Sequence, residues 1–199
     1  SVLVGGSFGQ VDGISRHTIV RLLENGMLDP TFHAQTPYSN ISPTVVGILP
    51  LEGNRTLVGG SLSGGYQLFY LAESGAIENQ SSASFSLISA MITIPGGRVL
   101  LGGQASQKAI VRLNSDGGFD ATFSPTFALG SGESIHALAA QTDGRILAGG
   151  ELNGNNSSGV RRMLRLTPEG VRDATFTASS ALGESVSTIA VQSSGKAIV

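Results

Sequence analysis

The sequence contains no cysteine and no tryptophan, and only 6% of its residues are aromatic. The absence of cysteine excludes disulfides, thiolate chemistry and zinc–thiolate sites. No apolar run approaches the roughly 20 residues that a membrane-spanning helix requires. We therefore expect no span of a bilayer.

Charge is also scarce. Charged residues make up 13% of the 199 residues, the formal net charge is −2, and the longest basic run is Arg161-Arg162. Binding to nucleic acid or to an anionic membrane depends on clustered Lys and Arg, so we expect neither partner. The two lysines, Lys108 and Lys196, stand against abundant Ser, Thr, Gly and Asn, a composition that favours an exported protein.

The chain contains a repeated unit, and residues 133–176 are its clearest copy. An alternating stretch is followed by Asp143-Gly144 and by a second apolar run that ends in Gly149-Gly150. Asp-Gly between two such runs predicts a hairpin with a type I′ turn. Met163–Leu166 predicts a third strand, and Asp173–Phe176 a short fourth strand. Each unit is thus expected to form one antiparallel sheet.

Paired glycines begin at residues 5, 59, 102 and 149, which gives spacings of 54, 43 and 47 residues. The predicted units are approximately 1–38, 39–86, 87–131 and 132–182, and a fifth starts within 183–199. The second unit lacks the Arg, Asp and Phe of the others, which agrees either with a lost ion pair or with drift. Residues 196–199 occupy the same phase as residues 1–4. We therefore expect a segment of a longer array, with a four-unit ring as the alternative.

A sheet of four short strands cannot cover both of its faces alone, so such units stack on one another. Four strands in a period of 40 to 50 residues are typical of β-propellers. We therefore predict an all-β protein: a single β-propeller region over residues 1–199, with four-stranded antiparallel blades, about four of them visible. A β-solenoid is the main competing architecture.

The residues that recur in the units are expected to be structural. Small residues permit close approach of neighbouring backbones, and the Phe residues would pack between blades. A carboxylate before Thr can cap a turn or pair with the recurring Arg. The recurring set is Gly5, Gly6, Gly59, Gly60, Gly102, Gly103, Gly149, Gly150, Arg21, Arg112, Arg165, Asp29, Asp120, Asp173, Phe32, Phe123 and Phe176.

The repeat runs Asp-Gly, Arg/Lys-Ile-Leu-x-Gly-Gly, then Arg-Leu-x-x-Asp-Gly-x-x-Asp-x-Thr-Phe. This pattern resembles the delta-60 repeat family of β-propellers in large bacterial surface and secreted proteins. The resemblance covers three copies well and the second in part. It implies an exported, multi-repeat, non-catalytic module, and it brings no ligand or active site with it.

No catalytic, cofactor or metal site is predicted. His17, His33 and His136 lie in three different phases of the repeat without further ligands at metal spacing. The Asp-Gly pairs at 116 and 143 lack the spaced oxygens of a calcium loop. The recurring Asp residues repeat in each good unit, whereas catalysis needs one asymmetric constellation.

Loops that vary on a constant scaffold are where recognition is usually placed. If the units are equivalent, the loops after the glycine pairs emerge on one side: Ser7–His17, Ser61–Gln67, Gln104–Lys108 and Glu151–Arg162. We therefore expect a non-catalytic structural or protein-interaction scaffold of an exported bacterial protein. Its partners would be another protein or a glycan at the cell surface, or further blades. The alternatives are a carbohydrate-binding adhesin and part of a propeller enzyme whose active residues lie outside this segment.

Overall fold

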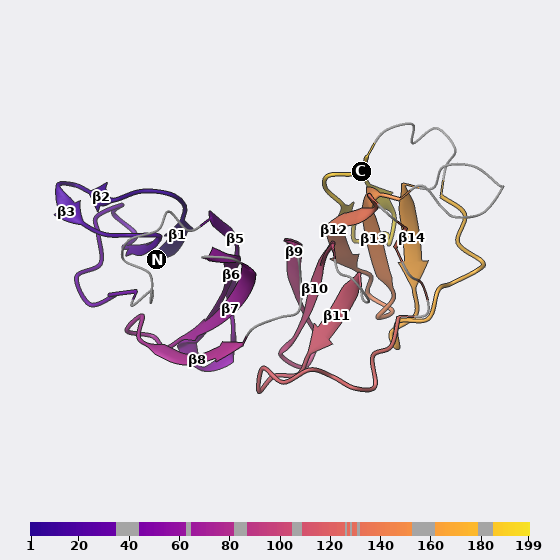
Figure 1. Cartoon of the computed structure of the whole chain (residues 1–199), viewed down its shortest axis with the longest axis horizontal. Coiled ribbons are helices and arrows are strands. Elements are labelled where there is room, and N and C mark those ends of the chain that lie inside the picture. Colours follow the sequence, from indigo (N-terminus) through magenta and orange to yellow (C-terminus); the bar gives the residue numbers. More distant parts are fainter. Residues whose placement is uncertain are drawn as a thin grey trace. The chain divides into compact units, whose positions relative to one another are not determined.

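A computed structural model describes residues 1–34, 44–62, 65–81, 87–104, 109–125, 127, 129–130, 132–152, 162–178 and 185–199 (Figure 1). The chain divides into two compact units, which we call unit 1 (Ser1–Ile88) and unit 2 (Ser89–Val199). Each unit is described by itself. Within the described residues, no helix is long and apolar enough to cross a membrane.

The described elements are almost entirely strands. Unit 1 contains β1 (Val2–Gly5), β2 (Gln10–Val11), β3 (Ile14–Ser15), β4 (Ile19–Leu22), β5 (Thr44–Pro50), the short 3-10 turn η1 (Glu52–Asn54), β6 (Thr56–Leu62), β7 (Gly65–Leu71) and β8 (Ile77–Ser81). Then come β9 (Leu87–Ile94), which begins at the unit boundary, β10 (Arg98–Gln104), β11 (Ile110–Leu113), β12 (Ser134–Ala140), β13 (Ile146–Glu151), β14 (Met163–Leu166), β15 (Ala190–Val191) and β16 (Ala197–Ile198).

The strands form antiparallel sheets in chain order, with one sheet for each repeat. Unit 1 contains the sheets β1-β4 and β5-β6-β7-β8. A small β2-β3 hairpin lies between β1 and β4 along the chain. Unit 2 holds β9-β10-β11, β12-β13-β14 and β15-β16. The expected all-β, antiparallel architecture is therefore confirmed, whereas the single region over residues 1–199 and its repeat boundaries stay predictions.

The predicted fourth strand is reduced to one isolated bridge in three repeats. These bridges are Leu22↔Leu28, Leu113↔Phe119 and Leu166↔Arg172. The backbone pairing stops there because the side chain of the aspartate that follows bonds to the backbone. Asp120 Oδ1 accepts a hydrogen bond from the Thr122 N–H at 2.9 Å, and the chain turns away from the sheet. Among the described residues, a full fourth strand is present only in the second repeat as β8, which is the strand that the degenerate motif had put in doubt.

The type I′ prediction at Asp143-Gly144 is wrong. A type I′ turn needs positive φ at both residues, but only Gly144 has it (φ 84). The Gly144 N–H donates to the Gln141 carbonyl, and the Gln141 N–H donates to the Arg145 carbonyl, which makes a five-residue turn with glycine at its fourth position. Asp143 Oδ1 accepts from the Arg145 N–H at 3.0 Å. The side chain of Asp143 thus holds the turn without a left-handed backbone of its own.

The paired glycines have two separate roles. A Cβ on Gly149 would lie 2.5 Å from Val186 Cγ1, and one on Gly102 would lie 2.7 Å from Ile135 Cγ2, so the first glycine makes room for a side chain of the next repeat. A Cβ on Gly150 would lie 2.0 Å from the Ser134 carbonyl oxygen, where β12 bulges. Gly150 therefore makes room for the backbone of its own sheet, whereas a Cβ on Gly6 would meet only the Phe8 side chain, at 3.6 Å.

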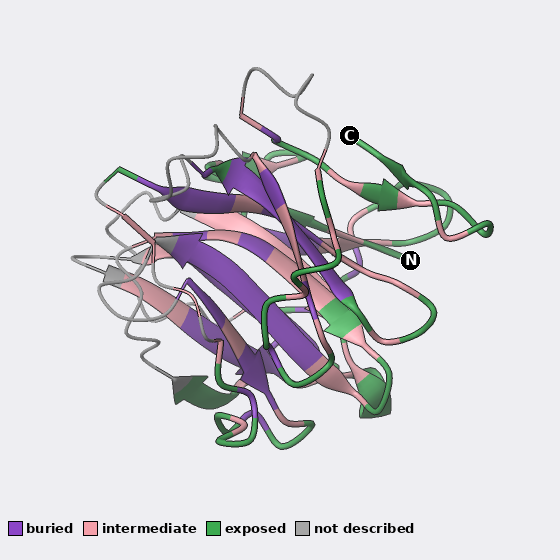
Figure 2. Ribbon diagram, turned by 90° about the vertical axis from the view of Figure 1, so that its right-hand side faces the viewer, coloured by how far each residue is buried: buried purple, intermediate pink, exposed green. Residues whose placement is uncertain are grey.

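The buried core lies between consecutive sheets, where the longer strands are mostly buried, whereas the turns and the short strands β3 and β16 are exposed (Figure 2). In unit 2, Leu100 and Ile110 pack with Ile146 and Ala148 in one cluster. In unit 1, an equivalent cluster joins Ile19, Phe32, Val58, Phe69 and Leu71. Neither sheet of such a pair could bury its apolar face alone, which agrees with the stacking that the repeat predicted.

Thr18 has a strained backbone at the base of the β2-β3 hairpin. Its φ is 71, a value that is unfavourable for a β-branched residue, and the Ile19 N–H donates to the His17 carbonyl at 2.7 Å across it. Its buried hydroxyl has no hydrogen-bond partner among the described residues. We expect Thr18→Gly to raise the free energy of unfolding of unit 1 by about 1 kcal/mol. Chemical denaturation measures this. Thr18→Ala removes the unpaired hydroxyl but keeps a side chain at positive φ, so it should give a smaller gain than Thr18→Gly.

Candidate functional site

Three repeats contain the same four-residue cluster, which we call a clasp. It consists of the arginine of the third strand together with the aspartate, threonine and phenylalanine of the Asp-x-Thr-Phe motif. The three clasps are Arg21, Asp29, Thr31 and Phe32 (clasp 1); Arg112, Asp120, Thr122 and Phe123 (clasp 3); and Arg165, Asp173, Thr175 and Phe176 (clasp 4).

Within clasp 3 every polar group has a partner. Arg112 Nε donates to Asp120 Oδ2 at 2.7 Å, and the Thr122 hydroxyl donates to Asp120 Oδ1 at 2.6 Å. The Arg112 guanidinium lies 4.7 Å from the centroid of the Phe123 ring, within the range of a cation–π contact. Clasp 1 repeats the arginine–aspartate bond at 2.7 Å and the ring contact at 5.0 Å. The aspartate therefore caps the turn and pairs with the arginine at the same time.

Clasps 1 and 3 also bind the next repeat. Arg21 Nη1 donates to the Glu73 carbonyl at 2.8 Å, and the His33 N–H donates to the Ser74 carbonyl at 2.8 Å. In unit 2, Arg112 Nη1 donates to the Pro168 carbonyl. The Ser124 N–H donates to the carbonyl of Glu169, the residue after Pro168, at 3.3 Å. Both clasps thus hold the turn that follows the third strand of the next repeat.

The turn held by each clasp contains a glycine against which the clasp packs. Gly75 and Gly170 have φ values of 87 and 92. A Cβ on Gly75 would lie 2.6 Å from the His33 carbonyl carbon and oxygen, and one on Gly170 would lie 3.0 Å from Phe123 Cε2. A left-handed backbone and the lack of space both require glycine there.

Hydrogen bonds lower the pKa of each clasp aspartate. The Thr31 hydroxyl, then the Thr31 N–H, then Arg21 lower the pKa of Asp29 from 3.8 to about 2. The Thr122 hydroxyl is the largest cause that lowers the pKa of Asp120 to about 2 against the opposing effect of burial. The Thr175 hydroxyl is the main group that lowers the pKa of Asp173. The aspartate of each clasp is therefore ionised, as a carboxylate, when it makes these hydrogen bonds.

A lowered folded-state pKa stabilises the protein above the unfolded pKa and loses this effect as the pH falls through the folded pKa. The contribution of Asp29 should therefore be complete above pH 3.8 and should disappear as the pH falls towards 2. We expect Asp29→Asn to be less stable than the wild type at neutral pH, with the difference shrinking across this window. Urea unfolding of the wild type and of the variant as a function of pH measures this difference in stability. A difference that does not change with pH would contradict the role of the Asp29 carboxylate.

The second repeat replaces the clasp with other residues. Tyr70 stands in place of the arginine, and Arg55 from the first hairpin lies 5.5 Å from the centroid of the Tyr70 ring. Arg55 Nε also donates to Glu78 Oε2 on β8 at 2.7 Å. The joint loss of Arg and Asp is thus accompanied by a different arginine–carboxylate pair.

Sequence reasoning missed the clasp threonines and the turn glycines. Thr31, Thr122 and Thr175 occur in every good copy of the motif, so their recurrence was the available signal. The turn glycines also recur, but their contact with the preceding repeat is a long-range feature. No pattern within one unit could show it.

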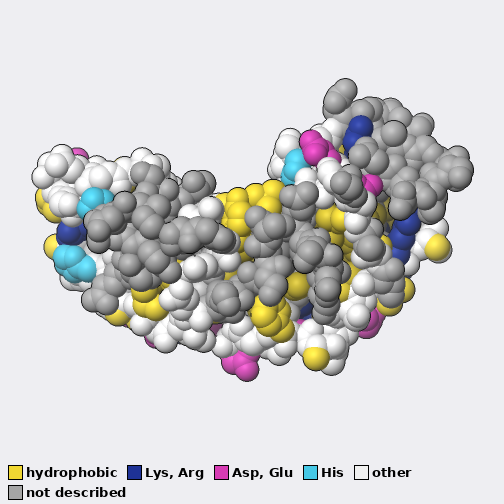
Figure 3. All heavy atoms as spheres, in the orientation of Figure 1, with side chains coloured by type: hydrophobic (Ala, Val, Ile, Leu, Met, Phe, Trp, Pro, Cys, Tyr) yellow, Lys and Arg dark blue, Asp and Glu magenta, His cyan; other side chains and the backbone are white. Residues whose placement is uncertain are grey.

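The three histidines do not meet one another as metal ligands. His136 lies between two hydroxyls, with Ser134 Oγ 2.6 Å from Nε2 and Ser185 Oγ 3.2 Å from Nδ1. His17 Nε2 lies 3.3 Å from Ser15 Oγ. In the described part of the chain, no group of three or more His, Asp or Glu side chains could hold a metal ion. Charged side chains lie scattered among uncharged ones on the face drawn in Figure 3.

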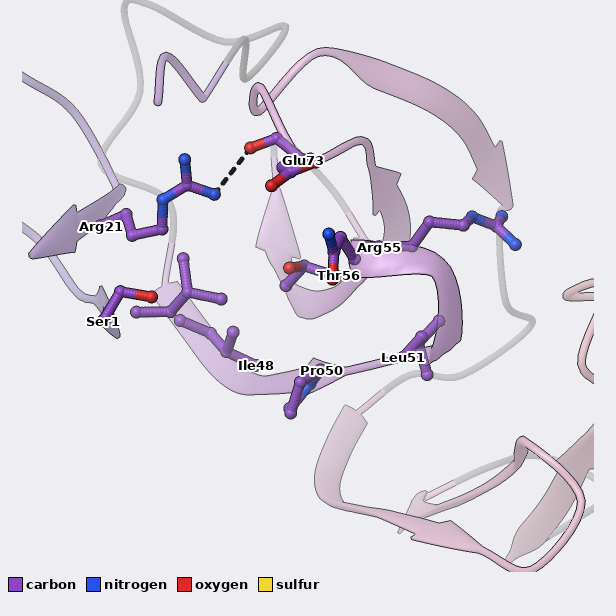
Figure 4. Close-up of a pocket in the computed structure, with 10 residues that line it drawn as sticks. Ser1, Arg21, Ile48, Pro50, Leu51, Arg55, Thr56 and Glu73 are labelled. Carbon is purple, nitrogen blue, oxygen red and sulfur yellow. Dashed lines mark hydrogen bonds between the residues drawn. The ribbon is translucent and has the colours of Figure 1, made fainter. Parts of the chain in front are cut away.

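Unit 1 has a cavity of about 420 Å³ between its two sheets. It is lined by Ser1, Leu3, Arg21, Ile48, Pro50, Leu51, Asn54, Arg55, Thr56 and Glu73. In Figure 4 the Arg21 guanidinium points to the Glu73 carbonyl. Arg21 is held by clasp 1 and Arg55 is paired with Glu78, so both cationic side chains of the lining are already engaged.

The structure describes one of the four predicted recognition loops in full. Ser7–His17 forms the β2-β3 hairpin, whose Asp12-Gly13 turn has positive φ at both residues (51 and 74), as a type I′ turn requires. The side chain of Ile14 is 47% exposed beside this turn. Ser61–Gln67 is described in part, whereas most of Gln104–Lys108 and of Glu151–Arg162 lies outside the described residues.

Comparison with known proteins finds a family model that is similar to parts of the chain. A model of a β-propeller domain of unknown function (DUF5122) matches residues 1–32, 95–123 and 141–176. These segments contain the three clasps. A search of curated proteins finds no match.

Two solved structures are similar to the chain. One is a protein of unknown function from Bacteroides caccae, with a TM-score of 0.54 and 15% identity over 77% of this chain and 57% of that one. The other is the extracellular domain of a putative one-component system from B. thetaiotaomicron, with a TM-score of 0.45 and 12% identity over 85% of this chain and 27% of that one. The chain thus spans less than two thirds of either structure. The fold is all-β with antiparallel sheets, and the family match supports a β-propeller repeat family.

Proposed function

We propose that the chain is a non-catalytic scaffold module of an exported bacterial multi-repeat protein. Its sheets form part of a propeller of about four visible blades, of the delta-60 repeat type, and they present variable loops to another protein or a glycan at the cell surface. The repeat motif and the low lysine content support this assignment.

The observation that carries the proposal is the repetition of the clasp. The same arginine, aspartate, threonine and phenylalanine join consecutive sheets in unit 1 and in unit 2, at residues 21–32 and 112–123. A catalytic group has no need to recur at each junction, whereas a rigid support does. The constant junctions leave the loops free to vary in sequence without loss of the sheets.

The Ser7–His17 hairpin supports recognition of a protein partner. Its type I′ turn fixes the tip, so little conformational entropy is lost when the tip binds. Ile14 exposes an apolar side chain at this tip. The exposed apolar residue at the tip is the aliphatic Ile14, and the aromatic residue of the segment, Phe8, is half-buried. A rigid hairpin of this kind suits a protein surface better than a sugar, for which exposed aromatic side chains would be expected.

Replacing residues 8–16 by a Gly/Ser segment of equal length tests the proposal. We expect the variant to keep the thermal midpoint of the wild type within about 3 °C, because the removed segment makes no clasp contact. On a glycan array, neither the wild type nor the variant should bind, because we propose that this hairpin recognises a protein. Loss of the fold in the variant would show that the hairpin is structural, and sugar binding that the variant lacks would replace the scaffold with the adhesin.

A further inference from the structure

The turn after the third strand of the first repeat contains an asparagine followed by a glycine, Asn25-Gly26. Two backbone hydrogen bonds close the turn: the Gly26 N–H donates to the Leu23 carbonyl at 2.9 Å, and the Leu23 N–H donates to the Met27 carbonyl at 2.8 Å. In the described part of the chain, the other asparagines precede a residue that has a side chain: Asn54, Asn79 and Asn114. Among these four, only Asn25 is followed by a backbone nitrogen with no Cβ beside it.

The Asn25 side chain is folded over this glycine. Its Oδ1 accepts a hydrogen bond from the Met27 N–H at 3.0 Å, and this turn brings the amide carbon Cγ towards the Gly26 nitrogen. The same hydrogen bond polarises the side-chain amide. It also places a donor at the oxygen that would carry negative charge if a nucleophile added to Cγ, and such donors stabilise tetrahedral intermediates.

Water has access to this side chain. Asn25 is exposed. Ser74 and Glu169, which stand at the same turn position, are also exposed, although clasps 1 and 3 hold their turns. Exposure of the side chain therefore belongs to this position of the turn and does not depend on whether a clasp holds it.

We infer that Asn25-Gly26 is a site of spontaneous deamidation, since asparagine is one of the thermolabile residues. The Gly26 nitrogen loses its proton and bonds to Asn25 Cγ, the Cγ–Nδ2 bond breaks, and the side-chain nitrogen takes up a proton and leaves as ammonia. Water then opens the cyclic imide. Its addition at Cγ gives an ordinary aspartyl residue, and its addition at the main-chain carbonyl carbon gives an isoaspartyl residue, whose backbone runs through Cγ.

The two products differ in their effect on clasp 1. The aspartyl product suits the turn, because Asp116 at the same position in the third repeat accepts from the Gly118 N–H at 2.8 Å. The isoaspartyl product adds one carbon atom to the backbone within the turn. The Asp29 N–H donates to the Arg21 carbonyl just after this turn, so the added atom displaces the chain that builds clasp 1. This inference does not depend on the proposed scaffold role.

The test incubates the full chain in mildly alkaline buffer and follows each asparagine by peptide mapping with mass spectrometry. We expect Asn25 to be converted at least about tenfold faster than Asn79 or Asn114, with release of ammonia and formation of aspartyl and isoaspartyl peptides. Conversion of Asn25 in urea but not in the folded chain would overturn the inference, because the turn would then protect the site. Equal rates at the three asparagines would overturn it as well.

A second measurement tests the link to clasp 1. Ion exchange isolates the reacted chain, and the peptide map gives its isoaspartyl content. Asn25→Asp supplies the same added charge on a backbone of ordinary length and is the matched control. We expect the urea midpoint of unit 1 to fall as the isoaspartyl content rises, whereas Asn25→Asp should unfold with the wild type. Equal midpoints for the isoaspartyl form and Asn25→Asp would contradict the effect on clasp 1.

Discussion

Arg112→Ala is expected to lower the free energy of unfolding of unit 2 by roughly 3 kcal/mol. The Arg112 side chain is 7% exposed and lies at the centre of clasp 3. Its removal takes away the bonds to Asp120 and to the Pro168 carbonyl and uncovers the Phe123 ring. The loss therefore includes packing and junction contacts as well as one ion pair. Because the chain contains no tryptophan, urea unfolding followed by far-UV circular dichroism measures the loss.

Arg145→Ala is the matched control for this change. It removes the same charge from the same unit, but the Arg145 side chain is 45% exposed. It pairs with Asp143 at 3.1 Å and, more distantly, with Asp173 of clasp 4 at 3.7 Å, and no bond from it to the turn of another repeat is present in the described residues. Exposed pairs of this kind contribute less than about 1 kcal/mol. Equal losses for the two variants would mean that Arg112 acts through charge alone and that the clasp does not hold the junction.

Gly75→Ala is expected to lower the free energy of unfolding of unit 1 by at least about 3 kcal/mol, whereas Gly26→Ala should cost about 1 to 2 kcal/mol. The two glycines occupy the same turn position in successive repeats and have similar φ values, 87 and 82. They differ in surroundings: a Cβ on Gly75 would lie 2.6 Å from the His33 backbone, and one on Gly26 would meet nothing within 4 Å.

The difference between these two variants isolates the contact with the preceding repeat, because the backbone strain is common to both. Chemical denaturation of unit 1 gives both values in one experiment. Similar losses would show that the turn glycine serves only the local turn and that its contact with clasp 1 contributes nothing.

The sequence was sufficient to predict strands one to three of the second, third and fourth repeats, because alternation and turn residues are local signals. It also predicted that the recurring aspartate would cap a turn or pair with arginine, and the structure contains both interactions in Asp29 and Asp120. Local pattern and local chemistry were enough for these features.

The failures come from competition that a single repeat does not reveal. The Asp-x-Thr-Phe pattern predicts a strand. The aspartate side chain instead accepts a hydrogen bond from the threonine N–H, and the backbone pairing ends after one bridge. Asp143-Gly144 reads as a type I′ turn, but its aspartate binds the Arg145 N–H instead of adopting positive φ. In both places a side-chain carboxylate decides the backbone path.

The junction contacts could not be predicted because they join residues about fifty positions apart. The bond from Arg112 to the Pro168 carbonyl and the packing of Gly170 on Phe123 depend on how two sheets stack. The sequence of one unit shows the arginine and the glycine as separate recurring residues. Their pairing follows only from the three-dimensional arrangement.

A double-mutant cycle of Arg112→Ala and Gly170→Ala tests most directly whether the clasp and the turn of the next repeat act as one junction. Each residue contacts Phe123, and Arg112 binds the same turn that contains Gly170. We predict that the double variant loses less stability than the two single variants together, by about 1 kcal/mol or more. Additive losses, equal within about 0.3 kcal/mol, would contradict the account.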